Sequence, residues 1–203
     1  MPVADDTSTR RHPISRGPGT NGPGTDGTDR FMTLFVDASF CHATRAAGYG
    51  AWAKEASFVS GLMFGGRLPG HCNNACDAEL NAIAAAMHRL SEQGHLAGLN
   101  SLLVQSDSVR SLQLIAGSVP GTRIANHAKA ATVTKKPLVS SPSERLAIVA
   151  IGNLAGGFRL LVRHVKGHKP GVSRQWVNRQ CDAMARRHMK DERARRRGQE
   201  VGT

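Results

Sequence analysis

Leu34-Phe35-Val36-Asp37-Ala38-Ser39 is the stretch that decides the fold, because a run of strand-forming apolar residues stops there at a single carboxylate. A continuous apolar run of this kind, starting at Phe31, is typical of a central strand that is covered on both faces. Gly48-Tyr49-Gly50 follows shortly afterwards and indicates a turn. We therefore expect the side chain of Asp37 at the end of a buried strand, facing that turn.

Three further carboxylates occur at comparable junctions. Glu79 lies early in a helical pattern over 74–90, in which Asn74 is the expected N-cap and Asp77 lies in the first turn. Asp107 closes a second buried strand and is followed by a helix, which implies parallel pairing with the first strand. Parallel pairing would bring Asp107 to the same sheet edge as Asp37. Asp182 is expected near the first turn of the last helix.

These patterns predict an α/β domain with a central five-stranded mixed sheet, three antiparallel strands followed by parallel ones, flanked by helices. The expected strands are 31–36, 49–53, 58–64, 101–106 and 158–165, with Gly65-Gly66 ending the third. The expected helices are 74–90, one opening at Asp107-Ser108, one over about 141–153 capped by Ser141, and one containing Asp182.

The rest of the chain has no comparable apolar pattern. Residues 1–30 are rich in Gly, Pro and Thr and are expected to form a disordered arm. The domain would span 31–190 and include a flexible basic loop at about 117–140, followed by a basic tail over 191–203. With 27 Lys and Arg against 15 Asp and Glu, the formal charge is +12, which favours a polyanionic partner such as nucleic acid.

Cysteine spacing and hydropathy exclude several other classes. The four cysteines show no disulfide framework, and His71-Cys72 with Cys76 lacks a second Cys/His pair, so a zinc site is not favoured. No apolar stretch is long enough for a membrane span and no signal core precedes the domain. We expect a cytoplasmic, monomeric protein.

Four converging carboxylates would suit Mg²⁺, which prefers oxygen ligands, and two such ions support phosphodiester hydrolysis. Taken singly, each acid could equally be a solvated surface group or a residue that starts a helix. Their joint occurrence in one order therefore matters more than any one of them.

That order resembles type 1 ribonuclease H. The resemblance rests on Phe35–Ser39, on Asn73-Asn74 before Ala78-Glu79-Leu80, on Ser106-Asp107-Ser108, and on Val165-Lys166-Gly167-His168 followed by Asn178 and Cys181–Arg186. It covers about residues 31–190. The chain departs from the family at Ala38, where glycine is usual, at Val109, and in a basic loop without aromatic residues.

The resemblance implies an endonuclease that cleaves the RNA strand of RNA:DNA hybrids with two Mg²⁺ ions, for which Mn²⁺ is expected to substitute, leaving 5′-phosphate ends. It implies metal binding by Asp37, Glu79, Asp107 and Asp182, and a role for His168 in proton transfer or product departure. The implied nucleic-acid contacts are Ser39, Asn73, Asn74, Lys135, Lys136, Lys166, Arg174 and Asn178. A related nuclease acting on junctions or chain ends, and a non-catalytic nucleic-acid-binding module, stay open as alternatives.

Overall fold

The computed structural model describes residues 29–57, 59–68, 70, 72–125, 140–166 and 174–200. Its strands are β1 (Phe31–Phe40), β2 (Ala47–Glu55), β3 (Leu62–Arg67), β4 (Ser101–Ser106), β5 (Arg123–Ile124) and β6 (Arg159–His164). Its helices are α1 (Ala75–Glu92), α2 (Val109–Ser118), α3 (Pro142–Leu154), a short 3₁₀ turn η1 (Ala155–Gly157) and α4 (Arg174–Glu200).

The strands form one mixed sheet in the order β3-β2-β1-β4-β6-β5. The β1–β2 and β2–β3 pairs are antiparallel, whereas β1–β4, β4–β6 and β5–β6 are parallel. This confirms the predicted mixed sheet, in which antiparallel strands precede parallel ones. Within the described residues the sheet has six strands rather than the expected five, because the two residues of β5 pair with β6 inside the segment that we predicted to be a loop.

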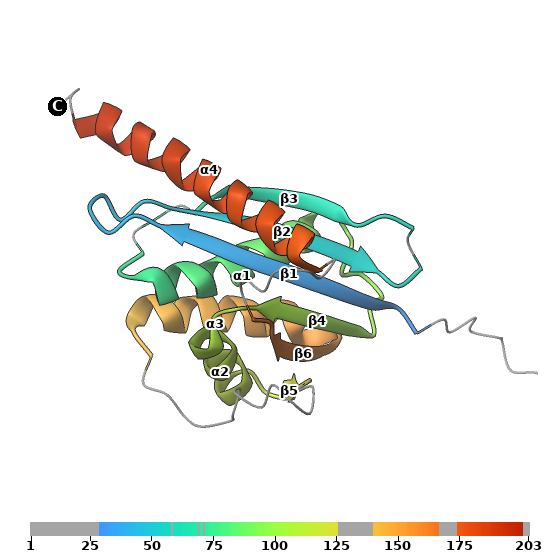
Figure 1. Cartoon of the computed structure of the whole chain (residues 1–203). Helices are drawn as coiled ribbons and strands as arrows, with labels where there is room; N and C mark the ends of the chain where they lie inside the picture. Colours follow the sequence, from blue (N-terminus) through green and yellow to red (C-terminus); the bar gives the residue numbers. More distant parts are fainter. Residues whose placement is uncertain are drawn as a thin grey trace, which may run out of the picture.

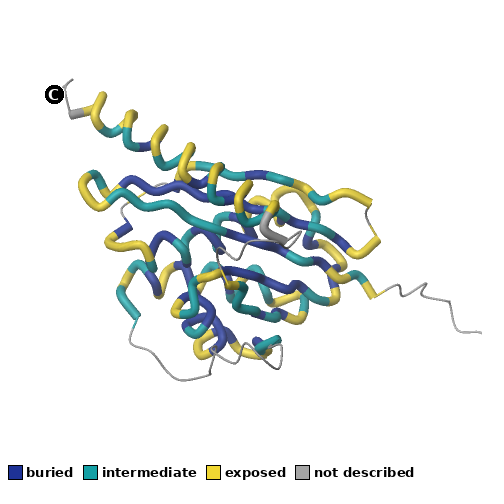
Figure 2. Tube along the Cα trace, in the orientation of Figure 1, coloured by how far each residue is buried: buried dark blue, intermediate teal, exposed yellow. Residues whose placement is uncertain are grey.

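Helices cover both faces of the sheet (Figure 1). The α4 helix crosses one face over β1, β2 and β3, and α1, α2 and α3 lie on the other side. The apolar stripe predicted on α1 is confirmed, since Leu80, Ile83, Met87 and Leu90 are all fully buried. Figure 2 shows the buried positions concentrated along β1, β2 and β4, between these helix layers.

Local side-chain caps fix the starts of three helices. The Asn74 side chain accepts a hydrogen bond from the backbone N–H of Asp77 at 2.9 Å. Ser108 caps α2, and Ser141 caps α3 in a capping box with Glu144. Each cap satisfies backbone donors that the first helical turn would otherwise leave unpaired. The predicted helix starts at 74 and 141 are therefore confirmed.

Glycines mark close packing in this protein where the sequence suggested turns. Gly48-Tyr49-Gly50 lies inside β2, and Gly65-Gly66 lies inside β3, so the predicted turn and the predicted end of the meander were wrong. A Cβ on Gly65 would come within 2.6 Å of the Met184 sulfur atom of α4. The strands continue through these glycines because residues without a side chain leave room for α4 to pack closely on the sheet.

The last helix is longer than predicted. It begins at Arg174, so Asp182 lies in its third turn rather than near its first. The residues from 191 that we expected to form a tail continue the same helix to Glu200. Glu192 is only 2% exposed, which anchors this part of α4 against the domain. No helix within the described ranges has the length and apolarity needed to span a membrane.

Candidate active site

Three of the predicted carboxylates meet at one edge of the sheet. Asp37 lies near the end of β1, Asp107 directly follows the neighbouring parallel strand β4, and Glu79 comes from the second turn of α1. One oxygen from each side chain lies within 4.8 Å of the others. The parallel β1–β4 pairing brings the two aspartates together, as the strand-then-helix pattern predicted.

Burial and the neighbouring carboxylates change the pKa of Asp37. Burial, then the charge of Asp107 and then that of Asp182 raise the pKa of Asp37 to about 7. The N–H of Ala38 and the charge of Arg186 oppose this rise. A cation at the cluster would favour the charged form of the Asp37 carboxyl.

Glu79 has an unsatisfied oxygen. Burial, with the charges of Asp37 and Asp107, raises the pKa of Glu79 well above its ordinary value, while hydrogen bonds from Ala38 and Ser106 lower it. Its Oε2 atom is buried without a hydrogen-bond partner among the residues that the structure describes. A buried orphan oxygen is unfavourable unless a ligand satisfies it. Three hard oxygen donors with one such orphan fit a divalent cation.

Asp182 approaches the cluster from the opposite face of the sheet. Its charge raises the pKa of Asp37, so the two carboxylates are electrostatically coupled. Asp182 is outside the three-residue cluster, however, and its Oδ1 accepts a 2.7 Å hydrogen bond from Arg186 Nε, one helical turn away. The fourth predicted ligand is thus adjacent to the cluster and held by an arginine.

The two predicted asparagine contacts also stabilise the start of α1. Asn73 donates from its Nδ2 to Asp77 at 2.9 Å, and Asn74 is the N-cap. Asp77 is fully buried and also accepts a hydrogen bond from Ser141 at 3.1 Å. Both asparagines are exposed, and the cap of α1 uses only the Oδ1 atom of Asn74.

The remaining predicted contacts lie in different places. Ser39 is two residues after Asp37 on β1, and therefore on the same face of the sheet. Lys166 is exposed just after β6, whose end lies beside that of β4. Asn178 is one turn before Asp182 on α4. His168, Lys135, Lys136 and the side chain of Arg174 lie outside the described residues.

Sequence reasoning missed two polar groups in the site. Ser106 hydrogen bonds to Glu79, and Arg186 pairs with Asp182. The four-residue spacing of Asp182 and Arg186 on a helix could have revealed the ion pair. Nothing local in the sequence links Ser106 to Glu79, because α1 and β4 meet only through packing.

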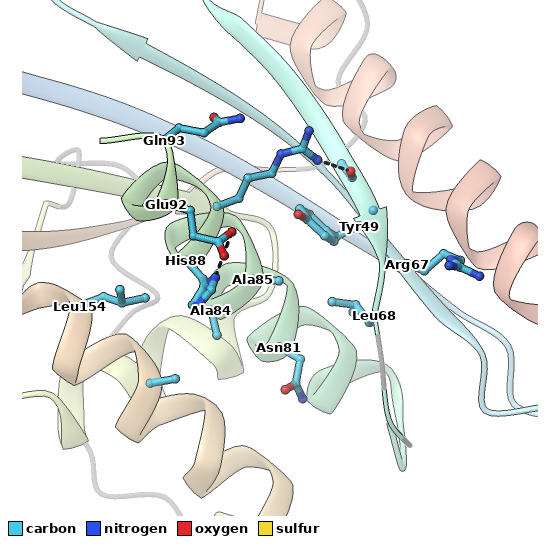
Figure 3. A pocket seen from close by; sticks show the side chains of 14 residues that line it. Tyr49, Arg67, Leu68, Asn81, Ala84, Ala85, His88, Glu92, Gln93 and Leu154 are labelled. Atoms are coloured by element: carbon cyan, nitrogen blue, oxygen red, sulfur yellow. Dashed lines mark hydrogen bonds and ion pairs between the residues drawn. The ribbon is translucent and has the colours of Figure 1, made fainter. Parts of the chain in front are cut away.

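A separate pocket lies away from the carboxylates. It has a volume of about 640 Å³ and lies between β3, α1 and α3 (Figure 3). Arg89 spans it and donates to the Gly65 carbonyl oxygen at 2.8 Å, and His88 pairs with Glu92 at 3.4 Å. None of the four carboxylates lines this pocket, so it is not part of the candidate active site.

Comparisons with known proteins agree with this fold. The family model described as RNase H matches residues 29–190. No curated protein matches the sequence. Among solved structures, the N-terminal RNase H domain of Rv2228c from Mycobacterium tuberculosis is 18% identical, with a TM-score of 0.57, over 81% of this chain and 97% of that one.

Two other structures have the same fold. RNase H1 of the archaeon Halobacterium salinarum is 18% identical, with a TM-score of 0.51, over 79% of this chain and 98% of that one. LC11-RNase H1, solved in complex with an RNA/DNA hybrid, is 15% identical, with a TM-score of 0.56, over 79% and 97%. Similarity at this level of identity supports the shared fold and leaves the activity to be argued from the site.

Proposed function

Because this chain belongs to the RNase H family, we propose that it is a metal-dependent endonuclease that hydrolyses the RNA strand of RNA:DNA hybrids. The observation that supports this most directly is the cluster of Asp37, Glu79 and Asp107, with its orphan buried oxygen on Glu79. A related protein, LC11-RNase H1, was crystallised with an RNA/DNA hybrid, which supports the choice of substrate.

Asp37, Glu79, Asp107 and Asp182 would hold two Mg²⁺ ions, and Mn²⁺ is expected to substitute. When bound, such a pair activates a water molecule and stabilises the leaving oxygen of the phosphodiester. The carboxylates orient the reacting groups and, through their mutual repulsion, favour cation binding. Arg186 holds Asp182 by an ion pair beside the cluster. The products would have 5′-phosphate and 3′-hydroxyl ends.

Recognition of a hybrid requires contact with 2′-hydroxyls on one strand and with deoxyribose on the other. Exposed Asn74 and Asn73, together with Ser39 and Asn178, are the proposed contacts for sugars and base edges. Lys166 lies beside the end of β4, where it would contact a phosphate of the bound strand. Lys135, Lys136 and Arg174 are proposed to bind further phosphates, and His168 to assist proton transfer or product departure.

The direct test is cleavage of a labelled RNA:DNA hybrid in Mg²⁺ or Mn²⁺, with double-stranded DNA, single-stranded RNA and a branched junction as competing substrates. We expect EDTA-sensitive cleavage of the hybrid alone, and its loss in Asp107→Asn. Preferential cleavage of the junction or of chain ends would favour a related nuclease. Metal-independent binding without any cleavage would favour a non-catalytic module.

A further inference from the structure

One side of α4 is a continuous basic surface. Five residues along it are basic and at least partly exposed, and we call them the basic stripe: Arg179, Arg186, Lys190, Arg193 and Arg197. Their spacings of seven, four, three and four residues place them on one side of a helix. At a rise of about 1.5 Å per residue, the stripe is about 27 Å long.

The stripe lies on the side of α4 away from the core, and Asp182 lies on the same side of the helix. Cys181, Ala185 and Glu192 are buried, and helical spacing places them on the opposite side of α4. Asp182 is one turn before Arg186 and eleven residues before Arg193, so helical spacing places all three on the same side. A shallow hollow of about 390 Å³ starts there and includes Asp182, Arg186 and Lys190 in its lining.

The part of α4 beyond residue 190 is fixed to the domain. Glu192 pairs with Arg195 at 2.7 Å and with Arg196 at 2.8 Å. Arg196 also donates to the carbonyl oxygens of Thr44, before β2, and Gly70, before α1. The end of α4 is therefore attached to the β1–β2 connection and to the β3–α1 connection. The stripe thus has a set position relative to Asp37 and Asp107.

The charges of the stripe are largely uncompensated. Arg179, Lys190 and Arg197 make no hydrogen bond or ion pair among the described residues. Asp182 is the only acid of α4 with a described side chain on the stripe side, and it already pairs with Arg186. Asp191 follows Lys190 and lines the same hollow from its far side, with its carboxylate 3.9 Å from the Nδ1 of His188. Arg186 with Lys190, and Arg193 with Arg197, are like-charge pairs four residues apart, which weakens a helix unless an anion lies across them.

We propose that the basic stripe binds the sugar–phosphate backbone of the duplex that enters the candidate active site, so that α4 extends the nucleic-acid footprint beyond the carboxylates. This inference rests on the proposed function for its choice of duplex. A stripe about 27 Å long, with one backbone phosphate per strand every 3.4 Å or so, would span roughly eight base pairs. Such contacts set affinity and register and do not read sequence.

The experiment uses the full chain and a fluorescent RNA:DNA hybrid of about 24 base pairs, with binding measured by anisotropy in EDTA across a salt series. The test variant is Lys190→Gln/Arg197→Gln. Its control, Lys54→Gln/Arg159→Gln, removes the same charge at the opposite end of the sheet, where β2 ends and β6 begins. Circular dichroism melts of all three proteins verify that they are folded.

If the stripe binds phosphates, the slope of log K against log salt concentration becomes shallower by about 2 in the stripe variant, since each lost phosphate contact removes about 0.9. The slope is unchanged in the control. An equal change in both variants, or no change in either, would overturn the inference. The KM for hybrid cleavage in Mg²⁺ should also rise in the stripe variant. A weakened salt slope without that rise would mean that site and stripe engage different molecules.

The two proposals fail separately. A parent protein that cleaves hybrid with a salt slope independent of the stripe retains the proposed function and loses this inference. A parent that cleaves no hybrid, but whose binding still depends on Lys190 and Arg197, loses the proposed function and retains a phosphate-binding stripe.

Discussion

Gly50 of β2 lies directly beneath the backbone of Cys181 in α4. A Cβ at position 50 would come within 2.2 Å of the Cys181 carbonyl oxygen, closer than any real contact of this kind. Gly50 is also the β2 partner of Asp37, so the same close approach brings Asp182 up to that carboxylate. Cys181 itself is fully buried, and burial together with Asp37 raises the pKa of its thiol to about 12.

We predict that Gly50→Ala displaces α4 and separates Asp182 from Asp37. The expected cost is about 2 kcal/mol of unfolding free energy, as for overpacking, together with a larger loss of hybrid cleavage. Gly152→Ala is the control, because the nearest atom to its Cβ would be 4.0 Å away and alanine favours a helix. Urea denaturation and cleavage rates check this, and a Gly50→Ala protein as active as the parent would contradict it.

Neutralising one member of the carboxylate cluster should stabilise the metal-free protein. Asp107→Asn removes a charge that raises the pKa of Asp37, so repulsion falls and the free energy of unfolding at pH 8 rises by about 1 kcal/mol. The same change should abolish the rise in melting temperature that Mg²⁺ gives the parent protein. Asp29→Asn, an exposed acid before β1, should change neither value. Thermal melts with EDTA and with Mg²⁺ distinguish the outcomes.

Acid stability should depend on Glu192. Hydrogen bonds from Arg195 and Arg196 lower the pKa of this buried carboxyl to about 2. Because the folded pKa lies below the unfolded value of about 4.3, the stabilisation is complete above that value and is lost as the pH falls toward 2. Glu192→Gln should destabilise the protein by about 3 kcal/mol at pH 7, since it removes the carboxylate charge beside the largely buried guanidinium of Arg196.

The difference in unfolding free energy between the parent and Glu192→Gln should shrink steadily as the pH falls from about 4.3 to about 2. Each limit of this pH window is expected to hold to about half a pH unit. Glu92→Gln serves as the control, because Glu92 is 66% exposed and its pair with His88 is a surface one. Chemical denaturation at several pH values makes the comparison. A pH-independent difference would mean that Glu192 acts only by packing.

Asn74 allows a structural role and a substrate role to be separated. Asn74→Asp keeps an oxygen that caps α1 and places a negative charge at the helix N-terminus, so stability should fall by less than about 0.5 kcal/mol. It loses the Nδ2 donor, so KM for the hybrid should rise at least several-fold. Asn74→Ala should raise KM in the same way and also lower the free energy of unfolding by about 1 kcal/mol, because the cap is lost. An unchanged KM in both variants would reduce Asn74 to a cap.

Much of the fold could be predicted from local patterns. The apolar run before Asp37, the stripe from Leu80 to Leu90 and the capping box at Ser141 each depend on residues within a few positions of one another. Such patterns report which side chains one element must bury and where its backbone donors need partners. The position of Asp107 beside Asp37 could also be predicted. A strand that is followed by a helix usually pairs in parallel with its neighbour, as β4 does with β1.

The tertiary structure decided the rest. The glycines at 50 and 65 indicate turns in sequence, yet they are packing sites, because only an assembled sheet places α4 against them. The basic residues after 190 have the composition of a solvated tail. They form part of α4 because Arg196 pairs with buried Glu192 and donates to the carbonyl oxygens of Thr44 and Gly70, which are far away in the sequence. The sequence alone determined which elements form and which edge the aspartates share. Packing between distant segments determined how closely the acids approach, because that distance depends on contacts that no local pattern contains.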